Sequence, residues 1–323
     1  MEHARRQILN KVPYLFYAVD LRAEMHKTLD DVPDYVGIVT PLFLVLALLE
    51  AAILVSYHRK EFAPLEAVAS FATGIVQQTL DVALRATGLA LYVAAYSHRF
   101  FTVPYDSLAG SLALILGVDL GYYTFHRFSH EFHIGWIGHS VHHSGDAYNL
   151  ATAIRQGAIS SLVAPFAYLP LALAGFSPAM YLTHRAFNLL YQFWIHTELV
   201  GSLGPLEYVL NTPSHHRVHH RPGANANYGG VLIVWDRLFG TFRPEAERRD
   251  HYGLGKPLGT LDPVYTQFAM LHRLAQSQDT ASGVLRMLAR RRLPPKWVVR
   301  PGALFEPVGA TREWRLPPSG SAK

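Results

Sequence analysis

The 323-residue sequence contains no cysteine. Disulfide bonds, cysteine-ligated iron–sulfur clusters and a thiolate-bound haem are therefore excluded. Charge is also scarce, because only 16% of the residues are Asp, Glu, Lys or Arg. Half of the residues are apolar, and the mean hydropathy is positive, at +0.11. This balance is unusual for a soluble domain of this length and indicates a membrane protein.

Apolar runs predict an all-α, multi-pass fold, a helical bundle in the membrane. Five runs are interpreted as spans. In chain order they cover residues 36–57, 68–96, 106–125, 159–174 and 178–195. The fourth is short and contains two prolines, so we expect it to kink or to enter the bilayer only partway. A tight turn joins the last two runs, and a hairpin of this kind returns the chain to the side that it left.

The two ends of the chain differ in character. The first ten residues lack an apolar core, so no cleavable signal peptide is expected. Residues 281–323 hold nine Lys or Arg against two Glu, which favours a cytoplasmic tail near anionic lipid over a nucleic-acid-binding segment. The expected organisation is a lead at 1–35, transmembrane helices at 36–104, a catalytic domain at 105–265 and a basic, Pro-rich tail at 266–323. The apolar run at 228–242 is too short to span the membrane and is expected to form a helix at the interface, and a further helix is expected over 266–276.

Ten histidines have the spacing of metal ligands. They are His126, His130, His139, His142, His143, His196, His215, His216, His219 and His220. Histidines at i, i+3 and i+4 of a helix project from one face and can converge on one ion. Neutral imidazole is the commonest side-chain metal ligand. Ten imidazoles exceed the four ligands of a structural zinc, so the set predicts two metals side by side.

Nitrogen-rich ligation without cysteine suits iron, zinc or copper. Glu131 and Glu198 stand close to the histidines and could serve a zinc hydrolase as the carboxylate base. A hydrolase, however, needs neither so many imidazoles nor membrane helices that cover the site. A non-haem di-iron centre that activates O2 explains both features. The hairpin brings all the histidine clusters to one face, which the positive-inside rule predicts to be cytoplasmic.

Three carboxylates are expected to support the ligands, namely Asp119 in the third predicted span, Glu131 and Glu198. Asp119 lies on the same helical face as His126 and His130. It could accept the outer N–H of a ligating histidine and fix its tautomer. A pairing of Asp119 with Arg127 or Arg155 is the alternative.

The histidine pattern resembles a known family. His-x3-His, His-x2-His-His and His-x2-His-His, in this order, are similar to the fatty acid hydroxylase/sterol desaturase superfamily of integral membrane di-iron enzymes. The flanking residues resemble its alkylglycerol monooxygenase-like members over roughly residues 100–265. The resemblance implies eight site histidines, with His196 and His215 as further ligands or their partners. The eight are His126, His130, His139, His142, His143, His216, His219 and His220.

The resemblance also implies a reaction. A lipid C–H bond would receive one oxygen atom of O2, and in alkylglycerol monooxygenase the attacked carbon is next to the ether oxygen. An ether lipid, a fatty acyl chain and a sterol all remain open as substrates. The implied reductant is tetrahydrobiopterin, with an electron-donor protein as the alternative, and no cofactor-binding residue is identified. The short loop between His220 and Asn227 departs from the family pattern and leaves substrate and reductant open.

Two other functions fit the same histidines. A lipid or sterol desaturase would use the same di-iron centre to remove two hydrogens rather than insert oxygen. A metal-binding membrane transporter or sensor belongs to a different class. It is disfavoured because the histidines lie at the ends of spans on one side rather than along a translocation path.

Overall fold

Helices make up all the regular secondary structure in the described parts of the chain. The computed structural model describes residues 10–58, 63–245, 251–277 and 281–292. Within these ranges the strand-like pairings are two isolated bridges, Phe132 with Arg291 and Leu210 with Leu232. The predicted all-α class is therefore confirmed. Of the basic tail predicted at residues 266–323, residues 278–280 and 293–323 lie outside the described residues.

Within the described residues, three helices are long and apolar enough to cross a membrane. They are α3 (Tyr35–Ile53), α4 (Pro64–Ser97) and α5 (Leu108–Glu131). Each corresponds to one of the first three predicted spans, and a π-helical turn, η2 (Leu54–His58), follows α3 directly. Large apolar side chains such as Leu48 and Val82 are exposed on them. Extensive exposed apolar surface is typical of contact with lipid, and the chain is an integral membrane protein.

The fourth and fifth predicted spans differ from these three helices. The fourth is divided into α7 (Ser160–Val163), η4 (Ala164–Ala167) and α8 (Leu169–Leu173). Pro165 and Pro170 stand in the first turns of η4 and α8, where a residue without an N–H is tolerated. The fifth is α9 (Pro178–Trp194), which has 17 residues and buries most of them. α9 is thus an interior helix of the bundle.

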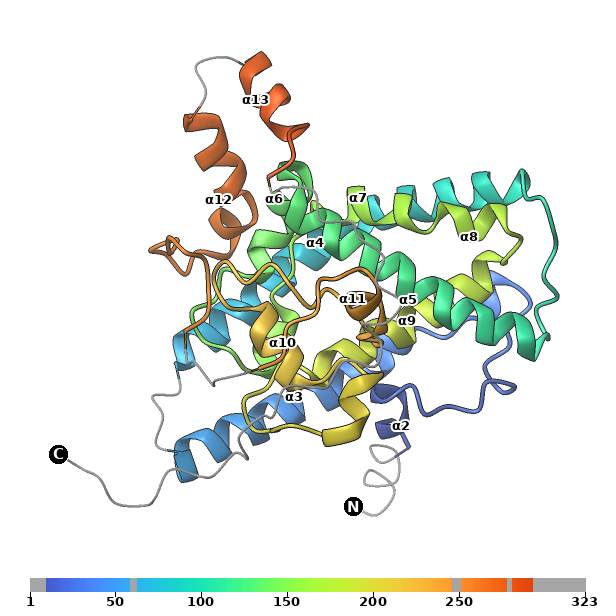
Figure 1. Cartoon of the computed structure of the whole chain (residues 1–323), viewed down its shortest axis with the longest axis horizontal. Helices are drawn as coiled ribbons and strands as arrows, with labels where there is room; N and C mark the ends of the chain where they lie inside the picture. The colour runs from blue at the N-terminus through green and yellow to red at the C-terminus, as the bar shows by residue number, and fades with distance from the viewer. Residues whose placement is uncertain (1–9, 59–62, 246–250, 278–280, 293–323) are drawn as a thin grey trace.

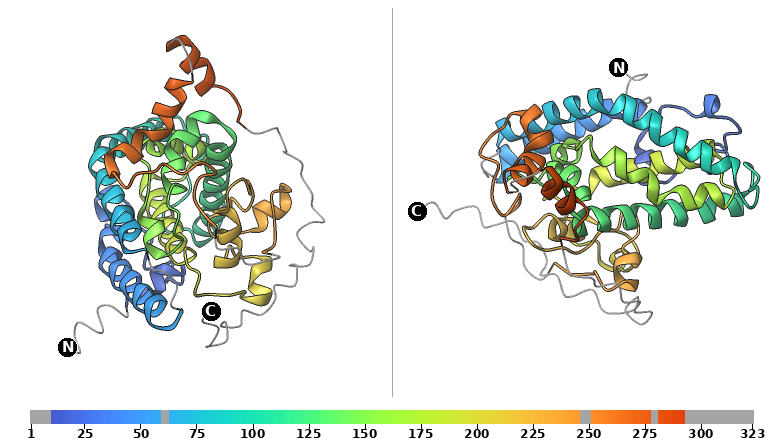
Figure 2. Two further views of the ribbon diagram at one scale, coloured as in Figure 1. Left: turned by 90° about the vertical axis from the view of Figure 1, so that its left-hand side faces the viewer. Right: turned by 90° about the horizontal axis from the view of Figure 1, so that it is seen from above.

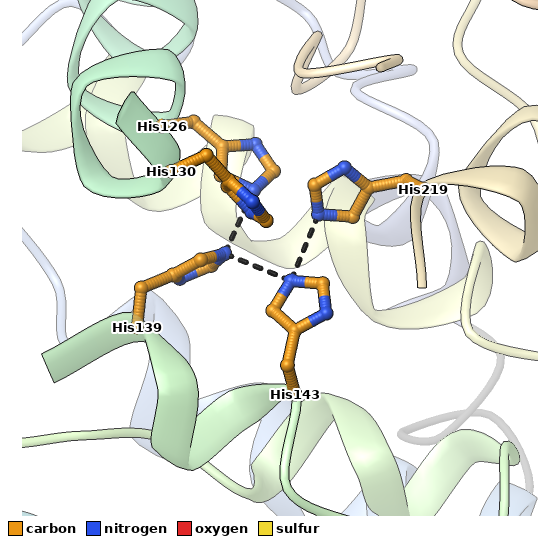
Figure 3. A group of neighbouring side chains, drawn as sticks. All are labelled: His126, His130, His139, His143 and His219. Carbon is orange, nitrogen blue, oxygen red and sulfur yellow. Dashed lines mark hydrogen bonds between the residues drawn. The ribbon is translucent and has the colours of Figure 1, made fainter. Parts of the chain in front are cut away.

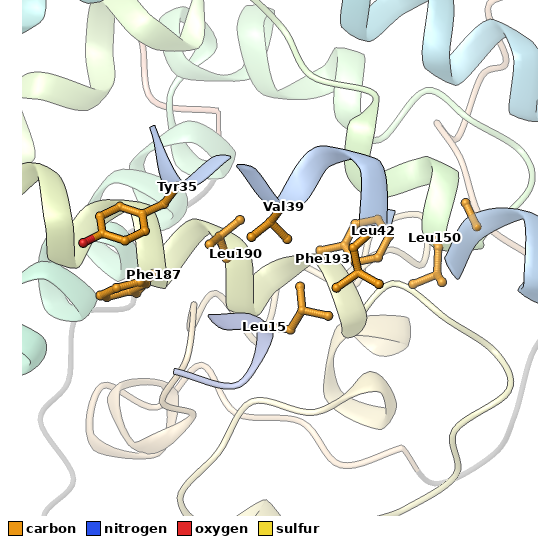
Figure 4. Close-up of a cluster of buried hydrophobic side chains, with 9 residues drawn as sticks. Leu15, Tyr35, Val39, Leu42, Leu150, Phe187, Leu190 and Phe193 are labelled. Carbon is orange, nitrogen blue, oxygen red and sulfur yellow. The ribbon is translucent and has the colours of Figure 1, made fainter. Parts of the chain in front are cut away.

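α9 is fixed by an apolar cluster that it shares with α3 (Figure 4). Phe187, Leu190 and Phe193 of α9 are buried there. Phe193 also stacks on Phe43 of α3, with ring centroids 3.9 Å apart. Within a bilayer such side chains stabilise the helix pair through van der Waals packing, because lipid tails are as apolar as the side chains themselves. The packing therefore sets the position of the carboxyl end of α9, which His196 follows closely.

A single extended residue separates α5 from the next helix. Phe132 (φ −121°, ψ 142°) ends α5 and precedes α6 (His133–His142). The chain changes direction at this residue, and α6 packs back against α5. The histidines near the end of α5 therefore face those of α6.

Shorter elements complete the chain around this helical bundle (Figures 1 and 2). They are α2 (Val12–Leu15), η1 (Leu29–Asp31), η3 (Leu150–Ile154), η5 (Gly204–Tyr208), α10 (Pro213–His219), α11 (Val234–Leu238), α12 (Pro263–Gln276) and α13 (Ala281–Leu288). α12 confirms a helix expected over residues 266–276. A helix expected over residues 228–242 is wrong, because only α11 is helical there. The residues before α11 run as non-helical chain past the end of α5.

Candidate metal centre

Nine of the ten predicted ligands meet in two buried groups. The five-histidine group contains His126, His130, His139, His143 and His219 (Figure 3). The four-histidine group contains His142, His196, His216 and His220. In each group the ligand nitrogens lie within 4.8 Å of one another. The spacing therefore predicted that the histidines converge, and the structure divides them into two centres.

Two helices contribute to both groups. His142 and His143, at the end of α6, are neighbours in sequence but belong to different groups, as do His219 and His220 at the end of α10. Successive residues of a helix point about 100° apart, so adjacent histidines can address two centres that lie side by side. Pairs four residues apart, such as His139 and His143, share one group. The helical register thus sets the partition of the ligands.

Backbone carbonyls hold the outer nitrogens of four ligands. The Nδ1–H of His126 donates to Tyr228 O at 2.8 Å, and that of His219 donates to Ala226 O at 2.9 Å. His142 donates in the same way to Arg155 O at 3.0 Å, and His196 donates to Gln192 O at 2.7 Å. A neutral imidazole that donates through Nδ1 has its lone pair on Nε2. All four lone pairs are therefore available to a metal.

The Nε2 atoms of these ligands face one another, and none of them carries a proton. His142 Nε2 and His196 Nε2 are 3.1 Å apart, although both carry lone pairs when their Nδ1 atoms donate. Two lone pairs at this distance repel unless a cation lies between them. Burial lowers the pKa of His142 to about 4 and that of His219 to about 3, so these imidazoles are neutral at neutral pH. The donor set therefore fits a pair of metal ions.

Asp119 supports the site in a way that the sequence did not predict. Its carboxylate accepts hydrogen bonds from Asn188 Nδ2, Val231 N, Leu232 N and Trp235 Nε1 at 2.7–3.0 Å. The expected direct contact with the outer N–H of a ligand is replaced, because a backbone carbonyl takes that position at His126. The alternative partners are engaged elsewhere: Arg127 donates to Glu131 at 2.8 Å, and Arg155 donates to Ser144 Oγ at 2.8 Å.

The other two predicted supporting carboxylates bind neighbours of the ligands. Glu131 forms ion pairs with Arg127 and with Arg291. Glu198 accepts a hydrogen bond from the Tyr252 hydroxyl at 3.0 Å. Both therefore link the histidine-bearing segments to other parts of the chain.

His215 is the predicted ligand that the structure does not bring to either group. Its ring instead packs edge-on against Phe242, with ring centroids 5.4 Å apart. His215 precedes His216 by one residue on α10, so its side chain leaves the helix from a different face. Spacing alone made the two neighbours equivalent as candidates.

Sequence reasoning missed several groups that hold the ligands. The acceptor carbonyls of Ala226, Tyr228, Arg155 and Gln192 have no sequence signature, because every residue carries a carbonyl. Glu50 of α3 was also missed: it is buried, accepts a hydrogen bond from Leu150 N at 2.6 Å and pairs with the hydroxyl of Thr197. An acidic residue within an apolar span is the signal that could have identified it.

A small cavity lies beside the five-histidine group only. Its volume is about 60 Å³, and His130, His143 and His219 form part of its wall. Arg292 also lines it, donates to His130 O at 2.8 Å and lies over the ring of Trp136 at 4.0 Å. No residue of the four-histidine group lines this cavity. The cavity therefore adjoins the five-histidine group.

Residues 111–241 match the fatty acid hydroxylase family. The chain is 45% identical to alkylglycerol monooxygenase of Homo sapiens over 261 residues, 79% of this chain and 58% of that relative. It is 32% identical to ornithine lipid hydroxylase OlsE of Rhizobium tropici over 144 residues, 42% of this chain and 44% of the relative. It is 25% identical to methylsterol monooxygenase 1 of Rattus norvegicus over 157 residues, 45% and 54% of the two chains.

The chain spans roughly three-fifths of the length of the alkylglycerol monooxygenases that it matches. No solved structure matches it. The nine grouped histidines all fall within the family match.

Proposed function

This chain belongs to the fatty acid hydroxylase family, and we propose that it is a membrane-bound non-haem di-iron monooxygenase that hydroxylates a C–H bond of a lipid with O2. The observation that carries this proposal is the pair of adjacent histidine groups, made of nine buried imidazoles. In the proposed reaction one oxygen atom of O2 would enter the substrate C–H bond and the other would leave as water. The reductant supplies two electrons and the solvent two protons.

The nine grouped histidines are the proposed ligands. The five-histidine group would hold one iron and the four-histidine group the other, and His215 is left out of the set. Iron bound there supplies the chemistry of O2 activation. The protein holds the imidazoles neutral and fixes their tautomers through the carbonyls described above. Deep burial of the ligands keeps bulk water away from the reacting atoms.

The proposed substrate is a lipid with an ether-linked chain. Alkylglycerol monooxygenases match most of the chain, and other relatives carry ornithine lipid and methylsterol in their names. An ether lipid is therefore the first compound to test. Fatty acyl lipids and sterols follow it.

We propose that the site lies at the cytoplasmic face, within a catalytic domain at residues 105–265. Buried and half-buried arginines, including Arg155, Arg217 and Arg221, surround the histidine groups, and Lys and Arg in short loops favour the cytoplasmic side. Tetrahydrobiopterin or an electron-donor protein is the proposed reductant. The cavity beside the five-histidine group is the nearest space through which a small molecule could approach.

The proposal is tested with the purified chain in lipid nanodiscs. The protein is loaded with iron, its iron content is measured, and an alkylglycerol, tetrahydrobiopterin and O2 are supplied. We expect two irons per chain and a product heavier by one oxygen atom, with the oxygen derived from labelled O2. The variant His142→Ala is the matched control and should form no product.

The same experiment separates the alternatives. A product lighter by two hydrogens, without labelled oxygen, would favour a desaturase. Full activity in iron-free protein would overturn the di-iron proposal. Iron flux across proteoliposomes without lipid turnover would instead favour a transporter.

A further inference from the structure

A strap of mostly non-helical chain holds the outer nitrogens of two ligands. We define the strap as residues 226–235, which follow α10 and include the first two residues of α11. Its Ala226 carbonyl accepts from His219, and its Tyr228 carbonyl accepts from His126. Both histidines belong to the five-histidine group. In the four-histidine group the two carbonyl acceptors, of Arg155 and Gln192, lie outside the strap.

Asp119 fixes the strap to α5. Its Oδ1 accepts from Val231 N at 2.8 Å, and its Oδ2 accepts from Leu232 N at 3.0 Å and from Trp235 Nε1 at 2.9 Å. Asn188 of α9 supplies the fourth donor, at 2.7 Å. The carboxylate is only 1% exposed, so these four hydrogen bonds replace its hydration. Three of the four donors belong to the strap.

The strap and α5 are therefore joined at two points with matching spacing. Asp119 and His126 are seven residues apart on α5, which is about 10.5 Å along a helix. Their strap partners Tyr228 and Val231 are three residues apart, and open chain covers up to about 3.3–3.6 Å per residue. If the strap slid along α5, both attachments would lose their partners. Asp119 thus sets where the Tyr228 carbonyl stands, and that carbonyl orients His126.

A glycine allows the strap to lie this close. A Cβ added to Gly230 would stand 2.9 Å from Asp119 Oδ1 and 2.8 Å from a ring carbon of Tyr122. Both distances are shorter than real Cβ contacts, so any larger residue would push the strap away from α5. On the other side, Asp236 accepts from Tyr228 N and Gly229 N, both at 2.7 Å. The strap is held from two sides by buried carboxylates.

We propose that Asp119 is a positioning residue that acts through the strap on His126, and so on the metal of the five-histidine group alone. This inference rests on the ligand set of the proposed function. It adds that the two metals depend on different supports. Loss of Asp119 should loosen one metal and leave the other in place.

The test compares Asp119→Asn with Asp81→Asn. Asp81 is also a buried carboxylate of a long helix, where it accepts from Gln77 at 2.8 Å and pairs with Arg85. The measurements are iron bound per chain, the Mössbauer spectrum of bound iron-57, and hydrogen exchange of the Val231 and Leu232 amides in metal-free protein. For Asp119→Asn we expect an iron affinity lower by roughly 10–100-fold at one site only, and faster exchange of both amides.

The Asp81→Asn protein should still bind both irons, and its strap amides should exchange as slowly as those of the wild type. The inference is overturned if the Asp119→Asn protein binds both irons with unchanged Mössbauer spectra and its Val231 and Leu232 amides exchange as slowly as in the wild type. Wild-type protein that binds no iron would instead overturn the proposed function, while the exchange experiment would still report on the strap.

A second variant covers the case in which Asp119→Asn does not fold. Gly230→Ala leaves every carboxylate in place and displaces the strap sterically. It should weaken the same single iron and speed exchange of the same two amides. Loss of both irons together in a folded Gly230→Ala protein would contradict a role confined to the five-histidine group.

Discussion

The two histidine groups have similar ligands but different supports. In the five-histidine group His126 donates to Tyr228 O, 102 residues later, and His219 donates to Ala226 O, seven residues later, so both outer nitrogens reach the strap. In the four-histidine group His196 donates to Gln192 O, four residues earlier, and His142 donates to Arg155 O, thirteen residues later. One group is thus supported by a single segment and the other by two separate segments. The comparison predicts that a change in the strap disturbs the five-histidine group first.

The largest expected effect comes from removing neighbouring ligands one at a time. His142→Ala should empty the four-histidine group and His143→Ala the five-histidine group, because the two residues face different centres. Both variants should lose more activity than the roughly 10–100-fold typical of residues that support a ligand. Mössbauer spectra of bound iron-57 should lose a different component in each variant. Loss of the same component in both would contradict the partition.

A smaller effect is expected from Arg155→Met, which acts on the support of the four-histidine group. Arg155 is buried, donates to Ser144 Oγ and pairs with Glu66 at 3.3 Å, so its side chain anchors the carbonyl that holds His142. We expect the free energy of unfolding to fall by about 1–3 kcal/mol. The loss of stability is smaller than for a fully buried ion pair, because the Glu66 side chain is 20% exposed.

Iron content decides whether the effect of Arg155→Met is local. The variant should weaken the iron of the four-histidine group and spare the other. The opposite pattern would show that the supports are not separate. Denaturant unfolding in detergent measures the stability change.

Chelation should distinguish the two groups without mutation. The cavity borders only the five-histidine group, so a small chelator can approach that metal more directly. We expect iron removal in two phases, with the faster phase belonging to the five-histidine group and several-fold quicker. Stopped-flow absorbance of the iron–chelator complex, combined with Mössbauer spectra of the half-depleted protein, measures this. A single phase would mean that access is equal.

The smallest effect is expected from Tyr148→Phe. The Tyr148 ring packs against His220 of the four-histidine group, with centroids 5.0 Å apart, and its hydroxyl donates to Ile195 O at 2.9 Å. Phenylalanine keeps the packing and removes only the hydrogen bond, which costs about 1 kcal/mol. Both irons should remain bound. Loss of an iron here would show that the hydroxyl does more than anchor the ring.

The sequence predicted the helical class, the three long helices and the convergence of the histidines, because these follow from local spacing. Periodicity could not divide the ligands between two centres, since His142 and His143 look equivalent in a list of spacings. It also could not separate His215 from His216, which leave α10 in different directions.

The support of the ligands was harder to predict. Asp119 was correctly singled out, but its donors come from residues more than sixty positions away, and two of the four are backbone amides. The strap itself was expected to be a helix because residues 228–242 are apolar. Two buried carboxylates that accept its backbone N–H groups hold it in a non-helical path instead.

The division of adjacent histidines between two centres also limits how this chain can change over evolution. One residue inserted between His139 and His142, or between His216 and His219, would rotate the later ligands by about 100° and turn them away from their centres. The loops that join the histidine-bearing helices carry no such register. Insertions, deletions and new specificities should therefore accumulate in those loops, while the lengths of α6 and α10 stay constant.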